Sequence, residues 1–174
     1  MKKAEAESAR LLHQYGIEAP PVDVHRLARA LGIDVQLERL DRSVSGMLVR
    51  SPSDDAAVIV VNGQHADVRQ RFTIAHELGH FLLHRGRPVI VDHLTRAHVN
   101  MRDETSSLAT STEEIAANQF AASLLMPTDW VTSAINSLDH LSSSRQVAAL
   151  ASTFDVSEQA MEYRLINLGL RAAP

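Results

Sequence analysis

The sequence predicts an α+β fold that is mainly helical, with a small three-stranded sheet packed on the helices. Between residues 33 and 61, three short apolar segments are separated by turn residues, which is typical of strands. In several longer segments, apolar residues recur three and four positions apart, as on one face of a helix. The length of 174 residues suits one domain, or one domain with a small appendage. We therefore expect a main domain over residues 1–139 and an appended helical segment over residues 140–174.

Two helices are predicted before the first strand, over residues 4–15 and 24–31. A pair of prolines interrupts the helical pattern between them. The Asp23 carboxylate can accept a hydrogen bond from the first turn of the second helix, and Gly32 favours the end of that helix.

Three strands are predicted next, over residues 33–38, 46–50 and 57–61. In the first of them apolar and polar residues alternate, which indicates a half-buried strand. The other two consist mostly of β-branched and other apolar residues. Residues 51–55 between them, Ser-Pro-Ser-Asp-Asp, favour a turn.

The longest amphipathic pattern begins after these strands, at Asp67. Asp67 and Gln70 resemble a capping box at the start of a helix, and Gly86 and Pro88 favour its end. A broad apolar face predicts that this helix is largely buried. That face consists of Val68, Phe72, Ala75, Leu78, Gly79, Leu82 and Leu83.

This helix carries the pattern His-Glu-x-x-His at His76, Glu77 and His80. Residues four apart lie on one face of a helix, one turn apart, so the two imidazoles can bind one Zn²⁺. Glu77 can then act as general base toward a water at the metal. The alternative is a core helix whose histidines are satisfied by hydrogen bonds alone. Because buried His and Glu side chains need partners, and a metal supplies one, the sequence favours a metal site.

Residues 88–110 are predicted to be irregular, apart from a short apolar run at their start. A connection this long is often a binding loop or a lid, and the alternative is an ordinary surface loop. It contains two histidines, His93 and His98.

A second buried helix is predicted over residues 107–126, and its first turn carries Glu113 and Glu114. Two histidines leave a catalytic zinc site incomplete, and two His with one carboxylate are a common ligand set. Either glutamate can therefore be the third ligand. Each can also belong to a capping box, where an acidic residue suits the helix dipole. Helical geometry does not choose between them.

The C-terminal part is predicted to form a short helix over residues 128–137 and a helix-turn-helix-like pair over residues 145–154 and 158–168. Residues 127–174 contain five acidic residues and three arginines, so this part of the chain repels phosphate. We expect the helix pair to complete the core or to dock a protein partner, and not to bind DNA.

Composition argues against several other classes of protein. The formal net charge is −4 and there is no long basic run, so direct binding of nucleic acid is not expected. The absence of cysteine excludes disulfides and thiolate ligands. No apolar run is long enough to span a membrane, and charged residues interrupt the N-terminal segment where a signal peptide needs an apolar core. The expected location is therefore the cytoplasm, with no role for a membrane.

With these motifs the chain resembles the ImmA/IrrE family of metallopeptidases. The resemblance covers nearly the whole chain and is most specific in its central half. The segments that carry it most clearly are 71–84 (RFTIAHELGHFLLH), 99–103 (VNMRD) and 113–127 (EEIAANQFAASLLMP). It implies that the main domain is a zincin-like core in which a glutamate three residues before an Ala-Asn pair completes the metal site. That pair is Ala117 and Asn118 here, which points to Glu114, with Glu113 as the alternative and Asn118 as a partner for a His ligand.

The resemblance also implies a function. Members are metal-dependent endopeptidases that cleave helix-turn-helix transcriptional repressors, so a repressor is the expected substrate and derepression the expected result. The alternative is a metal-containing regulatory partner that holds such a repressor without cutting it. Zn²⁺ is the expected cofactor, and Mn²⁺ suits the same ligands. His93, His98 and Tyr163 are candidates for stabilising the oxyanion, whereas His84 is expected to have a structural role or to support the metal ligands, and not to bind the metal.

Overall fold

The fold combines one small sheet with helices that pack on one of its faces. The computed structural model describes residues 2–50, 57–84, 89–92 and 111–172. Its sheet has the strand order β1-β3-β2-β4, with β1 parallel to β3 and the other neighbouring pairs antiparallel. The strands are β1 (Ile33–Glu38), β2 (Gly46–Arg50), β3 (Ala57–Asn62) and β4 (Val89–Asp92).

The fourth strand corrects the prediction of a three-stranded sheet. All three predicted strands are present, but β4 pairs with β2 from within the segment predicted to be irregular. Its apolar run was too short to distinguish a strand from a loop, because strand pairing depends on a partner that is distant in the sequence. The remainder of that segment, residues 93–110, lies outside the described residues, as do residues 85–88.

Seven helices are described, and each corresponds to a predicted one with its ends shifted by a few residues. They are α1 (Lys2–Gln14), α2 (Val24–Ala30), α3 (Asp67–Leu83), α4 (Ser111–Leu125), α5 (Thr128–Asn136), α6 (Ser143–Phe154) and α7 (Glu158–Asn167). The predicted cap of α2 is confirmed, since the Asp23 carboxylate accepts a hydrogen bond of 2.9 Å from the Arg26 backbone N–H. Residues 107–110, which were predicted as the start of the helix that contains α4, lie outside the described part of the chain.

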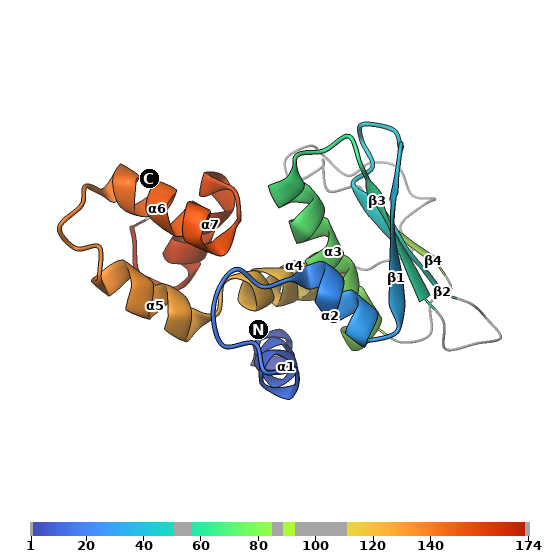
Figure 1. Ribbon diagram of the computed structural model, residues 1–174, viewed down its shortest axis with the longest axis horizontal. Helices are drawn as coiled ribbons and strands as arrows, with labels where there is room; N and C mark the ends of the chain where they lie inside the picture. Colours follow the sequence, from blue (N-terminus) through green and yellow to red (C-terminus); the bar gives the residue numbers. More distant parts are fainter. Residues whose placement is uncertain (1, 51–56, 85–88, 93–110, 173–174) are drawn as a thin grey trace.

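The inner face of the sheet forms part of the hydrophobic core. Leu48, Ile59 and Val61 alternate with half-buried residues along β2 and β3, and all three are fully buried. This period of two matches the alternation of faces along a strand. The inner face packs against α3, which lies between the sheet and the C-terminal helices in Figure 1.

Helix α3 begins and ends differently from the prediction. Its N-cap is Ala66, without a side-chain hydrogen bond, and Asp67 is the first helical residue. Instead of closing a capping box, the Gln70 side chain donates to the His65 carbonyl at 2.7 Å. An acidic residue in the first turn still suits the helix dipole. The helix ends at Leu83 with His84 as C-cap, before the predicted stop at Gly86.

Helix α4 packs closely against α3 because a glycine lies at their contact. A Cβ atom on Gly79 would lie 3.1 Å from the Ala117 Cα and 3.1 Å from the Phe120 Cδ1 atom. Both distances are shorter than an ordinary van der Waals contact, so a side chain here would require the α4 backbone and Phe120 to shift by a few tenths of an ångström. This close approach brings the first turn of α4 next to the His-Glu-x-x-His turns of α3.

Helices α5, α6 and α7 occupy the end of the molecule opposite the sheet (Figure 1). Their buried side chains, among them Phe154 and Met161, belong to the same core cluster as the sheet and α3. Two arginines add polar links to the rest of the fold. Arg71 on α3 donates to the Asp155 carbonyl between α6 and α7, and Arg164 on α7 donates to the Met126 carbonyl at the end of α4.

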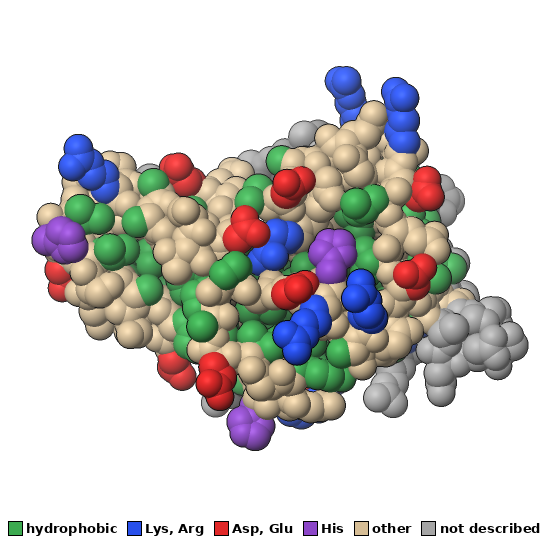
Figure 2. Space-filling view, viewed as in Figure 1, with side chains coloured by type: hydrophobic (Ala, Val, Ile, Leu, Met, Phe, Trp, Pro, Cys, Tyr) green, Lys and Arg blue, Asp and Glu red, His purple; other side chains and the backbone are tan. Residues whose placement is uncertain are grey.

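The surface shows no strong segregation of charge on the face in Figure 2, where acidic and basic side chains are interspersed. Among the described helices, none combines the length and the apolar character that crossing a bilayer demands.

Candidate metal centre

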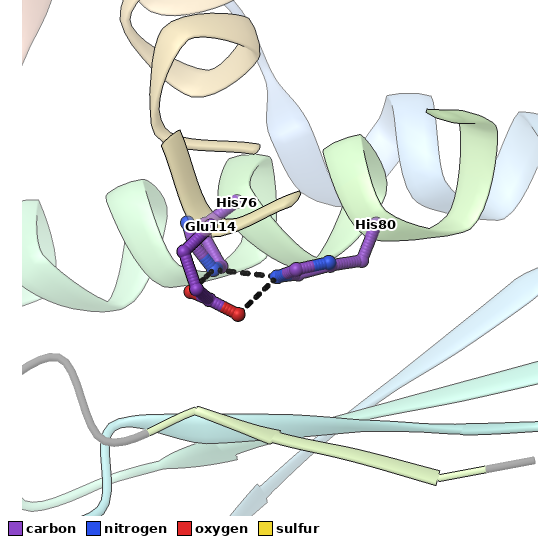
Figure 3. Close-up of side chains that lie close together, drawn as sticks. All are labelled: His76, His80 and Glu114. Atoms are coloured by element: carbon purple, nitrogen blue, oxygen red, sulfur yellow. Dashed lines mark hydrogen bonds and ion pairs between the residues drawn. The ribbon is translucent and has the colours of Figure 1, made fainter. Parts of the chain in front are cut away.

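Two histidines of α3 point in the same direction, as their spacing of four residues requires. His76 and His80 are both fully buried, and their Nε2 atoms lie 2.9 Å apart. Figure 3 shows both rings on the side of α3 that faces the strands of the sheet. This pair could be predicted from the sequence, because the spacing of four residues on a single helix is enough to bring the two rings together.

Glu114 comes from the first turn of α4 and completes the group (Figure 3). One of its carboxylate oxygens lies 3.3 Å from the His76 Nε2 atom, and the other lies 3.3 Å from the His80 Nε2 atom. The three potential ligand atoms all lie within 4.8 Å of one another. The carboxylate therefore faces the histidines and does not turn back toward its own helix N-terminus.

The chemistry of these three groups fits a divalent cation. Metal–nitrogen distances of about 2.0–2.1 Å in a tetrahedral site place neighbouring ligand atoms about 3.3 Å apart. The 2.9 Å between the two Nε2 atoms, and the 3.3 Å from each Nε2 atom to the nearer of the two Glu114 oxygens, are close to that value. Two imidazole nitrogens and a carboxylate that converge so closely repel one another through their lone pairs unless a proton or a cation lies among them. His76, His80 and Glu114 are thus able to hold a metal.

The outer nitrogens of the two imidazoles have partners of their own. The His76 Nδ1 atom lies 3.0 Å from the Asn118 side-chain oxygen, which can only accept, so Nδ1 donates this hydrogen bond. In the neutral imidazole, Nε2 then offers its lone pair to a cation, whereas without a cation a proton on Nε2 can bond to the Glu114 carboxylate. The His80 Nδ1 atom lies 3.2 Å from the His84 Nδ1 atom. Such contacts fix the orientation of metal-binding histidines. Both Asn118 and His84 lie where the sequence predicted supporting residues.

The protonation states suit metal binding. Burial lowers the pKa of the His80 imidazole, which favours the neutral form that can bind a cation. Burial on its own raises the pKa of the Glu114 carboxyl, but the hydrogen bonds to His76 and His80 outweigh it and hold that pKa well below its usual range. Glu114 is therefore ionised at neutral pH.

The predicted general base, Glu77, and the alternative third ligand, Glu113, both lie outside the group of three converging side chains. Glu77, between the two histidines in sequence, is fully buried on α3. Glu113 neighbours Glu114 in the first turn of α4 but is not part of the converging group.

Of the three oxyanion candidates, Tyr163 is the one that the structure describes. Tyr163 lies on α7 and is 57% exposed. In Figure 1 α7 and the sheet lie on opposite sides of α3, whereas the three converging side chains face the sheet. This placement argues against Tyr163 as the residue that stabilises the oxyanion. His93 and His98 lie outside the described residues.

One residue near the centre was not singled out from the sequence. Arg50, the last residue of β2, donates to carbonyl groups at the end of α3, including that of His80. No local pattern indicates this contact, because it depends on how the strand packs beside the helix.

Comparisons with known proteins agree with a metal centre formed by α3 and α4. Residues 28–166 match the family described as Peptidase_M78, IrrE N-terminal-like domain. The chain is 30% identical over 173 residues to the radiation response metalloprotease IrrE of Deinococcus deserti, a match that covers 98% of this chain and 55% of that protein. It is also 29% identical over 129 residues to the uncharacterised immunity region protein 2 of Bacillus phage phi105, covering 74% of this chain and 71% of the phage protein.

A solved structure shares the fold. A transcriptional regulator from Mycobacterium tuberculosis superposes with a TM-score of 0.61 at 20% identity, over 95% of this chain and 47% of the regulator. The chain thus spans about half the length of this regulator and of the Deinococcus protein. Because the family match runs from α2 to α7 and includes both histidines and Glu114, the chain belongs to the ImmA/IrrE family of metallopeptidases.

Proposed function

We propose that this protein is a metal-dependent endopeptidase that cleaves a helix-turn-helix transcriptional repressor at a specific site and so derepresses its target genes. The observation that carries the proposal is the convergence of His76, His80 and Glu114, with the buried carboxyl group of Glu77 on the same helix turn. Membership of a metallopeptidase family supports the class of reaction.

In this proposal His76, His80 and Glu114 hold the cation. Zn²⁺ is the expected ion, because two histidines and one carboxylate are a common catalytic zinc set, and Mn²⁺ suits the same ligands. When bound, the cation would lower the pKa of a water molecule and polarise the peptide carbonyl group. Asn118 and His84 would keep the two imidazole rings in the orientation that presents Nε2.

Glu77 is the proposed general base. It would take a proton from the attacking water as the oxygen bonds to the carbonyl carbon, and it would pass that proton to the amine as the C–N bond breaks. A base on the same helix as both histidines is held in a fixed position relative to them.

The substrate class rests on the family. The described relatives include a radiation response metalloprotease and a phage immunity region protein, which supports a regulatory setting. We further infer that residues 1–139 form a zincin-like peptidase domain and that residues 140–174 form a helix-turn-helix-like segment. Glu158 and Glu162 are exposed on α7, and Glu162 lies 3.8 Å from Arg171, so this segment can offer both charges to a protein partner.

The test is incubation of the full chain with the helix-turn-helix protein encoded beside it, with Zn²⁺ or Mn²⁺, followed by mass analysis of the products. We expect one cleavage in the repressor and no appreciable degradation of unfolded casein. The matched control is Glu77→Gln, which should keep the metal and lose about 10²–10⁴-fold in rate, the usual contribution of a general base.

Two outcomes would contradict the proposal. Loss of metal from Glu77→Gln, as complete as from His76→Ala, would show that Glu77 is a ligand and not the base. An intact repressor under each metal condition, in a tight complex with this protein, would replace the peptidase with a regulatory partner that does not cut.

A further inference from the structure

The C-terminal end of α3 lacks the usual glycine. The last four carbonyl groups of any helix have no partner within the helix, and a glycine with positive φ commonly helps to satisfy them. Here the C-cap is His84, with φ −125° and ψ 80°, and its N–H donates to the His80 carbonyl. Side chains from other elements can also satisfy the carbonyls of this last turn.

Arg50 supplies that capping from the end of β2. Its Nη2 atom donates to the His80 carbonyl at 2.9 Å, to the His84 carbonyl at 3.0 Å and to the Phe81 carbonyl at 3.2 Å. The guanidinium carbon also lies 5.1 Å from the centre of the Phe81 ring, within the range of a cation–π contact. A positive charge at a helix C-terminus is further stabilised by the helix dipole.

Two of the three residues that Arg50 holds by their backbones, His80 and His84, have side chains at the candidate metal centre. His80 supplies an Nε2 atom to the converging group, and His84 contacts the outer nitrogen of the same ring. The other histidine, His76, lies one turn earlier and is fixed instead by Asn118 of α4. Each imidazole thus depends on a different neighbouring element for its position.

We propose that Arg50 is a positioning residue for the metal centre, which locks the turn of His80 and His84 to the sheet. The inference rests on the proposed metal site. The two N–H groups of Nη2 are shared among the three carbonyls while the planar guanidinium lies over the Phe81 ring. A lysine offers only a point charge, and should replace it in part.

The experiment compares Arg50→Met with Arg69→Met in the full chain. Arg69 is a matched control because it links the opposite end of α3 to the start of β2, through one hydrogen bond of 2.8 Å to the Ser45 hydroxyl. Arg69 lies two turns before His76 on α3, and the partner in its hydrogen bond, Ser45, is not part of the metal centre. Circular dichroism establishes the fold of each variant, and Zn²⁺ affinity is measured against a chromogenic chelator.

We expect Arg50→Met to weaken Zn²⁺ binding by roughly 10–100-fold, as removal of outer partners at metal sites commonly does, and Arg69→Met to leave it unchanged. The visible absorption of the Co²⁺-loaded protein should change in Arg50→Met only. Arg50→Lys should recover part of the affinity. These readouts separate a positioning role from a general loss of stability, which both methionine variants share.

Equal Zn²⁺ affinity and equal Co²⁺ spectra for the two methionine variants would overturn the role of Arg50 and leave the metal site standing. If Arg50→Met does not fold, Zn²⁺ affinity is compared among wild type, Arg50→Lys and Arg50→Gln. A stepwise fall in affinity along this series supports the proposal, and equal affinities overturn it. Failure of the wild-type protein to bind Zn²⁺ or Co²⁺ would instead overturn the proposed function, and this inference with it.

Discussion

At the residue scale, Glu113 and Glu114 have the same side chain and adjacent positions but different surroundings. The Glu114 carboxylate lies 3.3 Å from the Nε2 atoms of both His76 and His80. Glu113 lies in the same first turn without joining that group, and there it contributes a favourable charge near the helix N-terminus. Their substitution should therefore have different consequences.

We predict that Glu114→Gln strongly weakens metal binding, because a neutral amide is a poorer ligand than a carboxylate. Glu113→Gln should instead cost about 0.3–1 kcal/mol of stability, the usual value for a charge at a helix end. Metal affinity by chelator competition and the free energy of unfolding in urea would distinguish the two. The reversed pattern would make Glu113 the ligand, and equal mild effects would assign both residues to capping.

Histidine burial predicts how the stability of the metal-free protein depends on pH. Burial lowers the pKa of both His80 and His84 in the folded state. The unfolded state then binds more protons than the folded state once the pH falls below the unperturbed His pKa of about 6.5. The free energy of unfolding should therefore decrease as the pH falls from about 7 to about 5.

Urea unfolding across this pH range, with metal removed, measures the effect. The double variant His80→Ala/His84→Ala should show a shallower dependence on pH. An unchanged slope in the double variant would assign the effect to other groups. The low pKa of Glu114 acts with the same sign at more acidic pH, where protonation of its carboxyl removes its interaction with the histidines.

At the scale of elements, the contact between α3 and α4 determines whether Glu114 reaches the histidines. Gly79 lies in that contact, one residue before His80 and facing Ala117. The absence of a side chain at this position lets the two helix backbones approach. A glycine inside a helix is unfavourable by about 0.5–1 kcal/mol, so its presence here is explained by packing and not by helix propensity.

We predict that Gly79→Ala destabilises the protein despite the better helix propensity of alanine. Overpacking typically costs about 1–3 kcal/mol, which exceeds the gain of about 0.5–1 kcal/mol. Metal affinity should fall as well, since α4 carries Glu114. The control is Gly63→Ala, whose added Cβ would meet its nearest atom at an ordinary 3.6 Å. A Gly79→Ala variant that is more stable than wild type, with unchanged metal binding, would contradict the packing argument.

At the scale of the whole molecule, the C-terminal helices share the core with the rest of the chain. Phe154 of α6 is fully buried in the same cluster as Leu78 of α3 and Ile59 of β3. The contacts of Arg71 and Arg164 add polar links between the same regions. A shared core favours cooperative unfolding of all these elements.

We predict that Phe154→Ala lowers the free energy of unfolding by about 3–5 kcal/mol, as for other buried Phe residues. The transition followed by fluorescence of Trp130, the only tryptophan, should coincide with the loss of helical circular dichroism. The exposed variant Glu158→Ala should change stability by about 0.5 kcal/mol or less. Two separate transitions in the wild-type protein would show that α6 and α7 unfold independently of the remainder.

The sequence by itself determined the features that depend on near neighbours in the chain. The positions of the helices follow from apolar periodicity, and the pairing of His76 with His80 follows from the turn of one helix. The Asp23 cap is equally local. The resemblance to the ImmA/IrrE family, confirmed by the match over residues 28–166, depended on the same short segments.

Only the tertiary structure decided the features that depend on packing between distant segments. The pairing of β4 with β2 could not be read from four apolar residues. The orientation of Glu114 was ambiguous on a helical wheel and depends on the approach of α4 to α3 at Gly79. The hydrogen bonds from Arg50 to the last turn of α3 join residues at least 30 positions apart. Such contacts leave no periodic signal, because strands and helices meet through three-dimensional packing, which the chain specifies only as a whole.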